Sequence, residues 1–322
     1  MSNQPLVSVF LPTYNQENFI SESIESALNQ TYRPIEIVIG DDCSQDNTWD
    51  IVRQYQKKYP DLIKAFRNAQ NLGITGNCNA ILSQCTGKYM VFMAGDDLIH
   101  PDKVKLQVAQ MESNPHIVLS YHDVEIFESA TGKTLSYWNS GKGSHKPFTG
   151  CAHRLTARLV ETTSTFLIML SAMIRRSSLP AGGYNSRIPI ASDWLLSINI
   201  LGEAADDSIV AFLPEPLAKY RRHSENVSKN NYSYHCDMLV TLAVVEDQYP
   251  ALVRAVDKGR ANIRAGMGIA KIYHGDFLAG RPLLWRNLTS GYISWRGMYW
   301  LVVSYFPMIH RIRVNLVLHR AG

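Results

Sequence analysis

The first 121 residues alternate between short β-branched segments and segments with helical apolar spacing, and this alternation restricts the fold more than any other feature. Leu6–Leu11 and Ile35–Ile39 are apolar runs typical of buried strands, and Ile20–Asn29 between them has helical spacing. Helices are then expected over Thr48–Lys58, Ile74–Ser83 and Asp102–Glu112, and strands over Ile63–Arg67, Tyr89–Met93 and Ile117–Tyr121. This order predicts an α/β fold with a doubly wound, mostly parallel sheet flanked by helices.

The pattern changes in the second half of the chain. A helix is expected over Asp193–Leu201 and a strand over Ile209–Leu213, but no strand signal follows Tyr234. We therefore expect a sheet domain at residues 1–230 and a helical C-terminal extension at residues 231–322. A chain of 322 residues with 46% hydrophobic side chains is long and apolar enough to bury the core of such a domain.

Polar sequences follow three of the expected strands, where a doubly wound sheet binds its ligands. They are Tyr14-Asn15, Asp41-Asp42 and Asp96-Asp97. Adjacent carboxylates repel each other unless a cation neutralises them, and Mg²⁺ or Mn²⁺ is typically held by one or two carboxylates plus substrate phosphates. Asp96-Asp97 is therefore a candidate metal site. Asp41-Asp42 can accept hydrogen bonds from a nucleobase or a ribose; the alternative for both pairs is a polar turn.

Two later segments carry groups suited to group transfer. Asp193 opens a helix after a loop rich in glycine and proline, either as a general base for an acceptor hydroxyl or as a first-turn acid of that helix. Arg221, Arg222 and His223 are adjacent, and they either neutralise a departing diphosphate or form a solvated basic turn.

Positive charge is concentrated at the C-terminus. Residues 251–322 contain 11 lysines and arginines and two acids, a net charge of about +9, whereas the whole chain has +4. Met298–Ile309 is the most hydrophobic stretch; it is shorter than the roughly 20 residues that span a bilayer, but its aromatic residues and flanking arginines suit an interface. We expect residues 291–322 to bind an anionic membrane surface, with a buried packing helix as the alternative, and we expect no nucleic-acid partner.

The N-terminal sequence has no charged segment followed by an apolar run, and the five cysteines include no C-x-x-C pair. These features predict a cytoplasmic protein without a zinc site or a disulfide framework. If the C-terminal segment binds lipid, the protein would be peripheral on the inner face of the cell membrane.

Seven segments, in this order along the chain, resemble the family 2 inverting glycosyltransferases, which have the GT-A fold. They are Val7–Asn15, Ser26–Tyr32, Ile37–Thr48, Asn71-Leu72-Gly73 with Asn79, Asp96-Asp97 with Pro101, Gly182-Gly183-Tyr184 with Asp193-Trp194, and Tyr220–His223 with Asn226 and Ser228. Each segment alone is a weak signal, but the ordered set over roughly residues 6–228 is specific.

The resemblance implies a role for each matching residue. Asp97, together with Asp96, would bind Mn²⁺ or Mg²⁺; Asp193 would be the catalytic base; Trp194 would shape the acceptor side. A nucleotide-sugar donor, expected to be a UDP-sugar, would be bound by Pro12, Thr13, Tyr14, Asn15, Asp41, Asp42, Asn71, Gly73, Asn79, Asp96, Trp194, Arg221, Arg222 and His223. The acceptor would be a glycan or a lipid-linked glycan in the synthesis of a bacterial polysaccharide or lipopolysaccharide.

The chain departs from the family pattern at three positions. Ala94 stands where a further Asp often precedes the metal-site pair, Cys78 replaces a common Arg, and Ser192 replaces the acid before the base. A nucleotidyltransferase that makes sugar nucleotides is an alternative, although no Gly-rich triphosphate loop opens the chain. A catalytically inactive sugar-binding or scaffold protein is another. A dinucleotide-dependent dehydrogenase is disfavoured, because the first strand is not followed by G-x-G-x-x-G.

Overall fold

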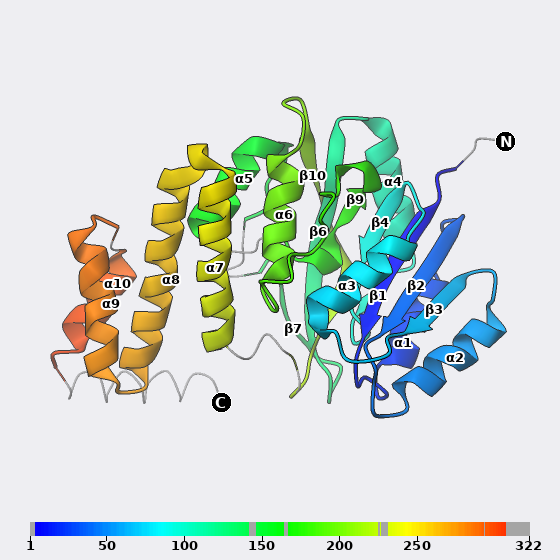
Figure 1. The fold of residues 1–322 in the computed structure, drawn as a ribbon, viewed down its shortest axis with the longest axis horizontal. Helices are drawn as coiled ribbons and strands as arrows, with labels where there is room; N and C mark the ends of the chain where they lie inside the picture. The colour runs from blue at the N-terminus through cyan, green and yellow to red at the C-terminus, as the bar shows by residue number, and fades with distance from the viewer. Residues whose placement is uncertain are drawn as a thin grey trace. The chain divides into compact units, whose positions relative to one another are not determined.

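A computed structural model describes residues 4–141, 146–163, 167–224, 226, 231–292 and 294–306. The chain divides into two compact units, one comprising residues 1–156 and 164–229 and the other residues 157–163 and 230–322. The first unit contains the sheet, and the second is built from helices (Figure 1).

The sheet of the first unit has ten strands. The main path is β3-β2-β1-β4-β9-β6-β10-β5, and β7 and β8 pair with β6 and β10. The strands are β1 (Val7–Thr13), β2 (Ile35–Asp41), β3 (Ile63–Arg67), β4 (Tyr89–Phe92), β5 (Leu98–Ile99), β6 (Ile117–Glu128), β7 (Thr134–Tyr137), β8 (Gly150–Cys151), β9 (Met173–Arg175) and β10 (Ile209–Arg222). The pairs β1–β2, β2–β3, β1–β4 and β6–β10 are parallel, whereas β9 runs antiparallel between β4 and β6. The predicted mostly parallel α/β sheet is confirmed.

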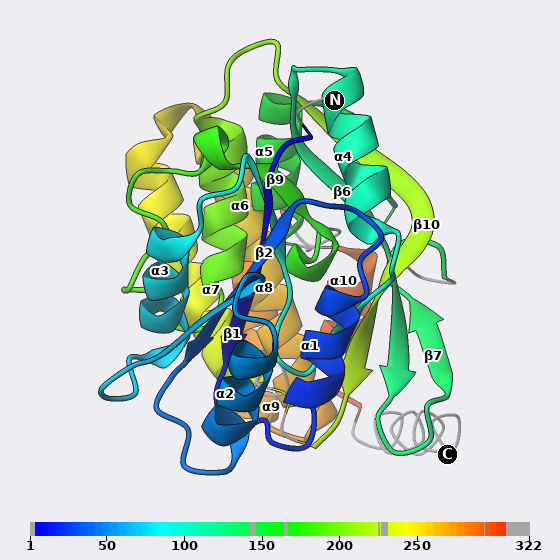
Figure 2. The ribbon, with the colours of Figure 1, turned by 90° about the vertical axis from the view of Figure 1, so that its right-hand side faces the viewer.

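Helices cover both faces of this sheet. They are α1 (Ile20–Leu28), α2 (Thr48–Lys58), α3 (Gly73–Gln84), α4 (Lys103–Ser113) and α6 (Ser192–Gly202), whereas α5 (Ala152–Thr162) begins in this unit and ends in the other. Alternate residues of a strand point to opposite faces, so Val7, Val9 and Leu11 join a core that includes residues of α1, α2 and α4. Phe10 points to the other face, where its ring stacks on that of Tyr184. Figure 2 shows α3 and α6 on one side of β1 and β2, with α1 and α4 on the other.

Strand β10 is longer than the sequence predicts. The expected strand ended at Leu213, but β10 continues to Arg222. Register shifts between Leu213 and Pro216 and between Pro216 and Ala218 accommodate the prolines, after which pairing with β6 resumes. The basic segment at Arg221 therefore ends a strand at the carboxyl edge of the sheet, rather than forming a turn after Pro216.

The second unit contains α7 (Asn231–Gln248), α8 (Val253–Tyr273), α9 (Phe277–Thr289) and α10 (Trp295–Val303). The predicted helical C-terminal region is confirmed for the part that the structure describes. Ile272, Leu284 and Leu301 form a buried core between α8, α9 and α10. No helix among the described residues is long and apolar enough to cross a membrane. Residues 307–322 of the predicted membrane segment lie outside the described residues.

Candidate functional site

The carboxyl ends of β1, β2 and β4 lie at one edge of the sheet, as predicted. Thr13 pairs with Asp41 at the end of the β1–β2 register. Just beyond, the Asp42 amide donates to the Thr13 carbonyl at 3.0 Å, and the Gly95 amide donates to the Pro12 carbonyl at 3.1 Å. The three polar loops named above therefore begin side by side.

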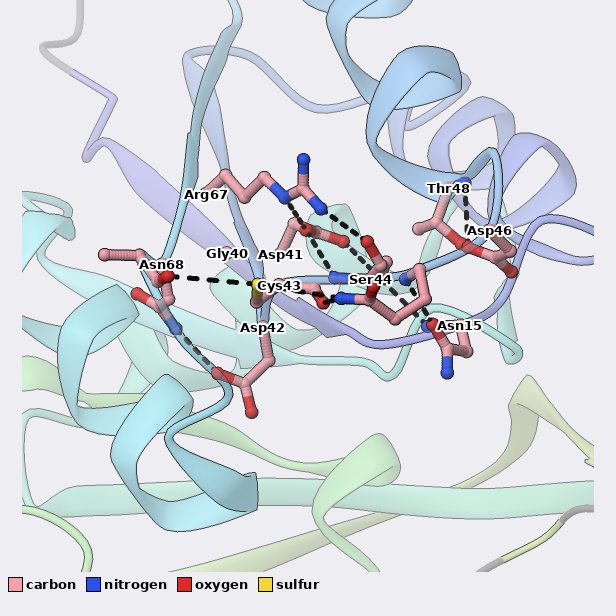
Figure 3. A network of polar contacts seen from close by, with 12 residues as sticks. Asn15, Gly40, Asp41, Asp42, Cys43, Ser44, Asp46, Thr48, Arg67 and Asn68 are labelled. Atoms are coloured by element: carbon pink, nitrogen blue, oxygen red, sulfur yellow. Dashed lines mark hydrogen bonds and ion pairs between the residues drawn. The ribbon is translucent and has the colours of Figure 1, made fainter.

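Asp41 is fully buried and builds the turn that follows β2 (Figure 3). Its carboxylate accepts hydrogen bonds from the amide of Ser44 at 3.0 Å and from the Ser44 hydroxyl, and it lies 3.3 Å from Nε of Arg67. These contacts give the buried Asp41 carboxylate its hydrogen-bond donors and its positively charged partner from the protein itself. The predicted contact of Asp41 with a nucleoside stays a prediction, and the structure gives this residue a structural task as well.

Asp42 holds the loop between β3 and α3. Its Oδ1 accepts from Asn68 Nδ2 at 2.9 Å and from the Leu72 amide at 2.8 Å. In the same loop the Asn71 side chain accepts from the Gly73 amide at 2.9 Å, and Gly73 has a φ of 74°, which favours glycine. Asn71 and Gly73, predicted as donor-binding residues, therefore shape the backbone beside Asp42.

The loop after β1 is braced against the loop after β2. The Asn15 amide donates to the Ser44 hydroxyl at 2.9 Å, and the Asn15 side chain accepts from the Gln45 amide at 2.8 Å (Figure 3). Thr13 is buried, whereas Tyr14 is 44% exposed. An exposed aromatic ring next to this rigid turn is available to stack on a flat ligand.

Asp96 and Asp97 follow β4, and their environments differ from each other. Asp97 is 4% exposed, and its Oδ1 accepts from the Arg221 amide at 3.0 Å. Burial, and next the negative charge of Asp96, raise the pKa of Asp97 well above its usual value. The Asp96 carboxylate lies 2.9 Å from Nε2 of His223. The two acids and His223, which the sequence analysis placed in one site, are therefore together.

Arg221 and α1 hold this loop in position. The Arg221 side chain, only 5% exposed, donates to the Asp96 carbonyl at 2.7 Å and to Glu22 at 2.6 Å. The Ser23 hydroxyl donates to the carbonyls of Gly95 and Asp97 at 2.9 and 2.8 Å. Glu22 and Ser23 were not predicted as site residues; the one signal in the sequence is that Ser23 interrupts the apolar stripe of α1. The predicted diphosphate contact of Arg221 stays a prediction, as does that of Arg222, which is exposed.

The residues at this loop fit a divalent cation that the donor helps to bind. The described part of the chain contains no group of three or more His, Cys, Asp or Glu side chains arranged to hold a metal ion. Mg²⁺ and Mn²⁺ sites of nucleotide enzymes commonly use one or two carboxylates and complete the coordination with phosphates and water. The carboxyl groups of Asp96 and Asp97 are adjacent, and burial raises the pKa of Asp97, so a bound cation would favour the ionised form of Asp97.

Asp193 lies in the first turn of α6 on the other face of the sheet from α1. Although Asp193 is exposed to solvent, desolvation by the surrounding protein raises its pKa to about 6. A hydrogen bond from the Tyr184 hydroxyl acts in the opposite direction and lowers this pKa. A carboxylate with a pKa near 6 is a stronger base than an ordinary Asp and is still mostly ionised at neutral pH.

The loop before Asp193 is fastened to α3. The Asn79 side chain donates to the Tyr184 carbonyl and accepts from the Tyr184 amide, both at 2.8 Å. Gly183 has a φ of 59°, and a Cβ there would lie 2.5 Å from Asn79 Oδ1, so glycine permits the approach. Asn79 therefore positions Tyr184; its predicted contact with the donor stays a prediction.

The two acids Asp42 and Asp193 lie near one residue of α3. The thiol of Cys78 is buried, and its pKa is raised well above the usual value, first by burial and then by the negative charges of Asp193 and Asp42. On α6, the side-chain atoms Ser192 Oγ and Trp194 Nε1 flank Asp193, are buried, and have no hydrogen-bond partner among the described residues. Such atoms are costly to bury, which favours a rearrangement that satisfies them.

Comparisons with known proteins establish the family. The family model described as glycosyl transferase family 2 matches residues 8–182. An uncharacterized glycosyltransferase of Haemophilus influenzae is 32% identical over 233 residues, which are 71% of this chain and 69% of that protein. The putative glycosyltransferase EpsE of Bacillus subtilis is 40% identical over 116 residues, 36% of this chain and 42% of that protein. The chain therefore belongs to glycosyl transferase family 2.

The chain spans 62% of the length of an uncharacterized Mycobacterium tuberculosis protein to which it is 28% identical over 235 residues, 70% of this chain. Among solved structures, S. aureus TarS 1–349 in complex with UDP-GlcNAc has a TM-score of 0.58 at 20% identity, covering 74% of this chain and 66% of that one. Mannosyltransferase PcManGT from Pyrobaculum calidifontis, in complex with GDP-Man and Mn²⁺, has a TM-score of 0.59 at 14% identity, covering 98% and 88%. At these identities the two structures support the GT-A fold.

Proposed function

We propose that this protein is an inverting glycosyltransferase that moves a sugar from a nucleotide diphosphate to an acceptor hydroxyl. The observation that carries the proposal is the placement of two kinds of acid around one sheet. Asp96 and Asp97 lie together at the carboxyl edge, where burial and the neighbouring Asp96 raise the pKa of Asp97, and Asp193 opens α6 with its pKa raised to about 6. Membership of glycosyl transferase family 2 supports it.

In the proposed reaction the donor binds at the loops after β1, β2 and β4. Tyr14 stacks on the nucleobase, and Asp42 accepts hydrogen bonds from the nucleoside. Asp97 and Asp96 would hold Mn²⁺ or Mg²⁺, and such an ion would offset the negative charge of the leaving diphosphate. The donor is proposed to be a UDP-sugar; TarS, whose fold is similar, was solved with UDP-GlcNAc and UDP.

Asp193 is proposed to act on the acceptor. Its carboxylate takes the proton of the acceptor hydroxyl as that oxygen bonds to the anomeric carbon and the bond from that carbon to the diphosphate oxygen breaks. One displacement of this kind inverts the anomeric configuration. Trp194 is proposed to border the acceptor, which is a glycan or a lipid-linked glycan of polysaccharide or lipopolysaccharide synthesis. We propose that the reaction takes place in the cytoplasm at the inner face of the membrane; the strongly basic residues 251–322 support the membrane location.

The experiment is to measure sugar release from a panel of UDP- and GDP-sugars, with and without Mn²⁺, and nucleoside diphosphate binding by calorimetry. The wild-type protein should hydrolyse at least one donor in a Mn²⁺-dependent manner. Asp193→Asn should bind nucleoside diphosphate as the wild type does but lose transfer to acceptor by about 10²-fold or more. Asp50→Asn, which removes an exposed acid of α2, is the matched control. Equal transfer by Asp193→Asn and wild type would assign the base to another group.

A further inference from the structure

Helix α10 is apolar on two sides, one of which is exposed. Leu301 and Val303 are buried, and Leu301 packs against Ile272 and Leu284. Large apolar side chains at positions i, i+4 and i+7 of α10 lie on one face, away from Leu301, and Phe306 follows three residues after the end of the helix. They are Trp295 (85% exposed), Tyr299 (41%), Val302 (54%) and Phe306 (52%). A helix on the surface of a soluble domain normally has a polar outer face.

Helix α9 extends this exposed apolar side. Leu278 is 88% exposed and Trp285, seven positions later, is 45% exposed. Trp285 Nε1 donates to the Tyr305 hydroxyl at 2.9 Å, which joins the two helices at this face. Arg281 lies with its guanidinium 4.1 Å from the Tyr305 ring centroid and donates to the Ser304 carbonyl. We call this surface the α9–α10 face; it consists of Leu278, Arg281, Trp285, Trp295, Tyr299, Val302, Tyr305 and Phe306, and the exposed Arg286 and Arg296 directly follow Trp285 and Trp295 in the sequence.

The charged side chains of α9, α10 and the residues between and after them are all positive. Residues 277–306 contain three arginines, Arg281, Arg286 and Arg296, and no Asp or Glu. Arg286 and Arg296 are exposed. A surface that combines exposed Trp and Tyr with arginine, and lacks acids, is complementary to the boundary between lipid headgroups and acyl chains in an anionic bilayer. The helices of the described chain are too short or too polar to span such a bilayer, so binding on its surface is the geometry they permit.

We propose that the α9–α10 face is a docking surface for an anionic lipid bilayer, on which α10 lies with its exposed apolar side among the headgroups. The two tryptophans and Val302 supply apolar area, and Arg286 and Arg296 contact lipid phosphates. Only the purpose of this docking rests on the proposed function, because it brings the enzyme to a lipid-linked acceptor; the binding itself does not depend on that function.

The experiment is co-sedimentation of the full-length protein with vesicles of phosphatidylglycerol and phosphatidylcholine at 3:7, and with vesicles of phosphatidylcholine alone. The wild type should bind the anionic vesicles at least tenfold more strongly than the neutral ones, and the tryptophan emission should shift to shorter wavelength. The Arg286→Gln, Arg296→Gln double variant should bind roughly tenfold to thirtyfold more weakly, because each charge near an anionic surface contributes to binding. Trp295→Ser with Val302→Ser should weaken binding by a similar factor, by removing apolar area.

Two controls match these variants. Arg254→Gln removes an exposed charge of α8, and Leu135→Ser with Tyr137→Ser removes exposed apolar side chains from β7 in the other unit. Both should bind vesicles as the wild type does. Melting temperatures within about 2 °C of the wild type would show that each variant is folded, since surface substitutions rarely change stability by more than 0.5 kcal/mol.

Three results would overturn the proposal. The first is equal vesicle binding by the wild type and both α9–α10 variants. The second is a wild type that ignores vesicles but is a dimer that Trp295→Ser with Val302→Ser converts to a monomer, which would make the face an interface between copies. The third is a full-length chain that does not bind while a chain ending at Phe306 does, which would show that residues 307–322 cover the face. Donor hydrolysis without added lipid separates this proposal from the proposed function: loss of hydrolysis with intact vesicle binding would refute the function alone.

Discussion

The two Asp pairs at the carboxyl edge of the sheet have the same sequence and opposite surroundings. In the pair after β2, both carboxylates have partners within the protein. Asp41 accepts a hydrogen bond from Ser44 and pairs with Arg67, and Asp42 accepts hydrogen bonds from Asn68 and from the Leu72 amide. In the pair after β4, Asp97 receives one backbone donor, and burial together with the negative charge of Asp96 raises its pKa. The first pair therefore stabilises the fold without a ligand, whereas Asp97 in the second pair would ionise more readily beside a bound cation.

Asp97→Asn is the variant expected to have the largest effect on transfer, and it tests whether the pair after β4 differs from the pair after β2. Transfer should fall by about 10²–10³-fold, because charge stabilisation by a metal ion is worth several kcal/mol and each 1.4 kcal/mol is tenfold in rate. The melting temperature in EDTA at pH 7 should not fall. The pKa of Asp97 is raised in the folded state, so its ionised form opposes folding once the pH exceeds its unfolded value, and Asn removes that cost. A clear drop in melting temperature in EDTA would show that Asp97, like Asp41, stabilises the fold without a cation.

Asp41→Asn should have the opposite signature. It removes a fully buried acceptor of the Ser44 turn and the partner of Arg67, and hydrogen bonds to charged groups contribute about 1.5–3 kcal/mol. We expect the free energy of unfolding to fall by about 2 kcal/mol in urea titrations, while folded protein keeps transfer activity within about tenfold of the wild type. Asp50→Asn is the control with the same charge change. A variant as stable as that control would contradict the structural role of Asp41.

Tyr184→Phe extends the comparison to Asp193, which has one side-chain donor. That donor lowers the pKa of Asp193, so its removal should raise the pKa above about 6. The base acts in its ionised form, and the acidic limb of log kcat/KM against pH should therefore move upward by about half a unit to one unit. The loss would be about threefold to tenfold at pH 5.5 and under about twofold at pH 8.5. An unchanged acidic limb with a uniformly lower rate would mean that Tyr184 serves only to pack the loop.

The smallest effect is a ligand-induced shift in melting temperature. Mn²⁺ with a nucleoside diphosphate, each about tenfold above its dissociation constant, should raise the wild-type value by about 2–4 °C. Asp97→Asn should lose the Mn²⁺-dependent part of the shift, and Asp50→Asn should keep it. A full shift in Asp97→Asn would place the cation elsewhere.

Local periodicity was sufficient to predict the N-terminal half of the sheet. The helix Thr48–Lys58 and the strand Ile63–Arg67 have the predicted bounds, because each has its own apolar pattern and polar connections. The continuation of β10 past Pro216 was not predictable in this way. Proline interrupts strand patterns, and only the pairing with β6, which lies far away in the sequence, restores the strand that brings Arg221 to Asp97.

The supports of the candidate site also depend on contacts between distant segments. Asn79 and Tyr184 are 105 positions apart, and neither residue predicts the other. Lys103, at the start of α4, is fully buried and bonds to Gln107, His122 and the Ser171 carbonyl. Burial lowers the pKa of Lys103 well below its usual value. Such a residue is tolerated only when several elements bring acceptors together, which a one-dimensional pattern does not reveal.

Helix α3 is hydrogen-bonded to the end of β2 and to the loop before α6. At the start of the helix the Leu72 amide donates to Asp42, and in its middle Asn77 donates to the Gly40 carbonyl at 2.9 Å. Two residues further along, Asn79 is hydrogen-bonded to the backbone of Tyr184. Helix α3 therefore connects the loop beside Asp42 with the segment that leads to Asp193. Under the proposed function, a displacement of α3 on donor binding would also move the segment that carries the proposed base.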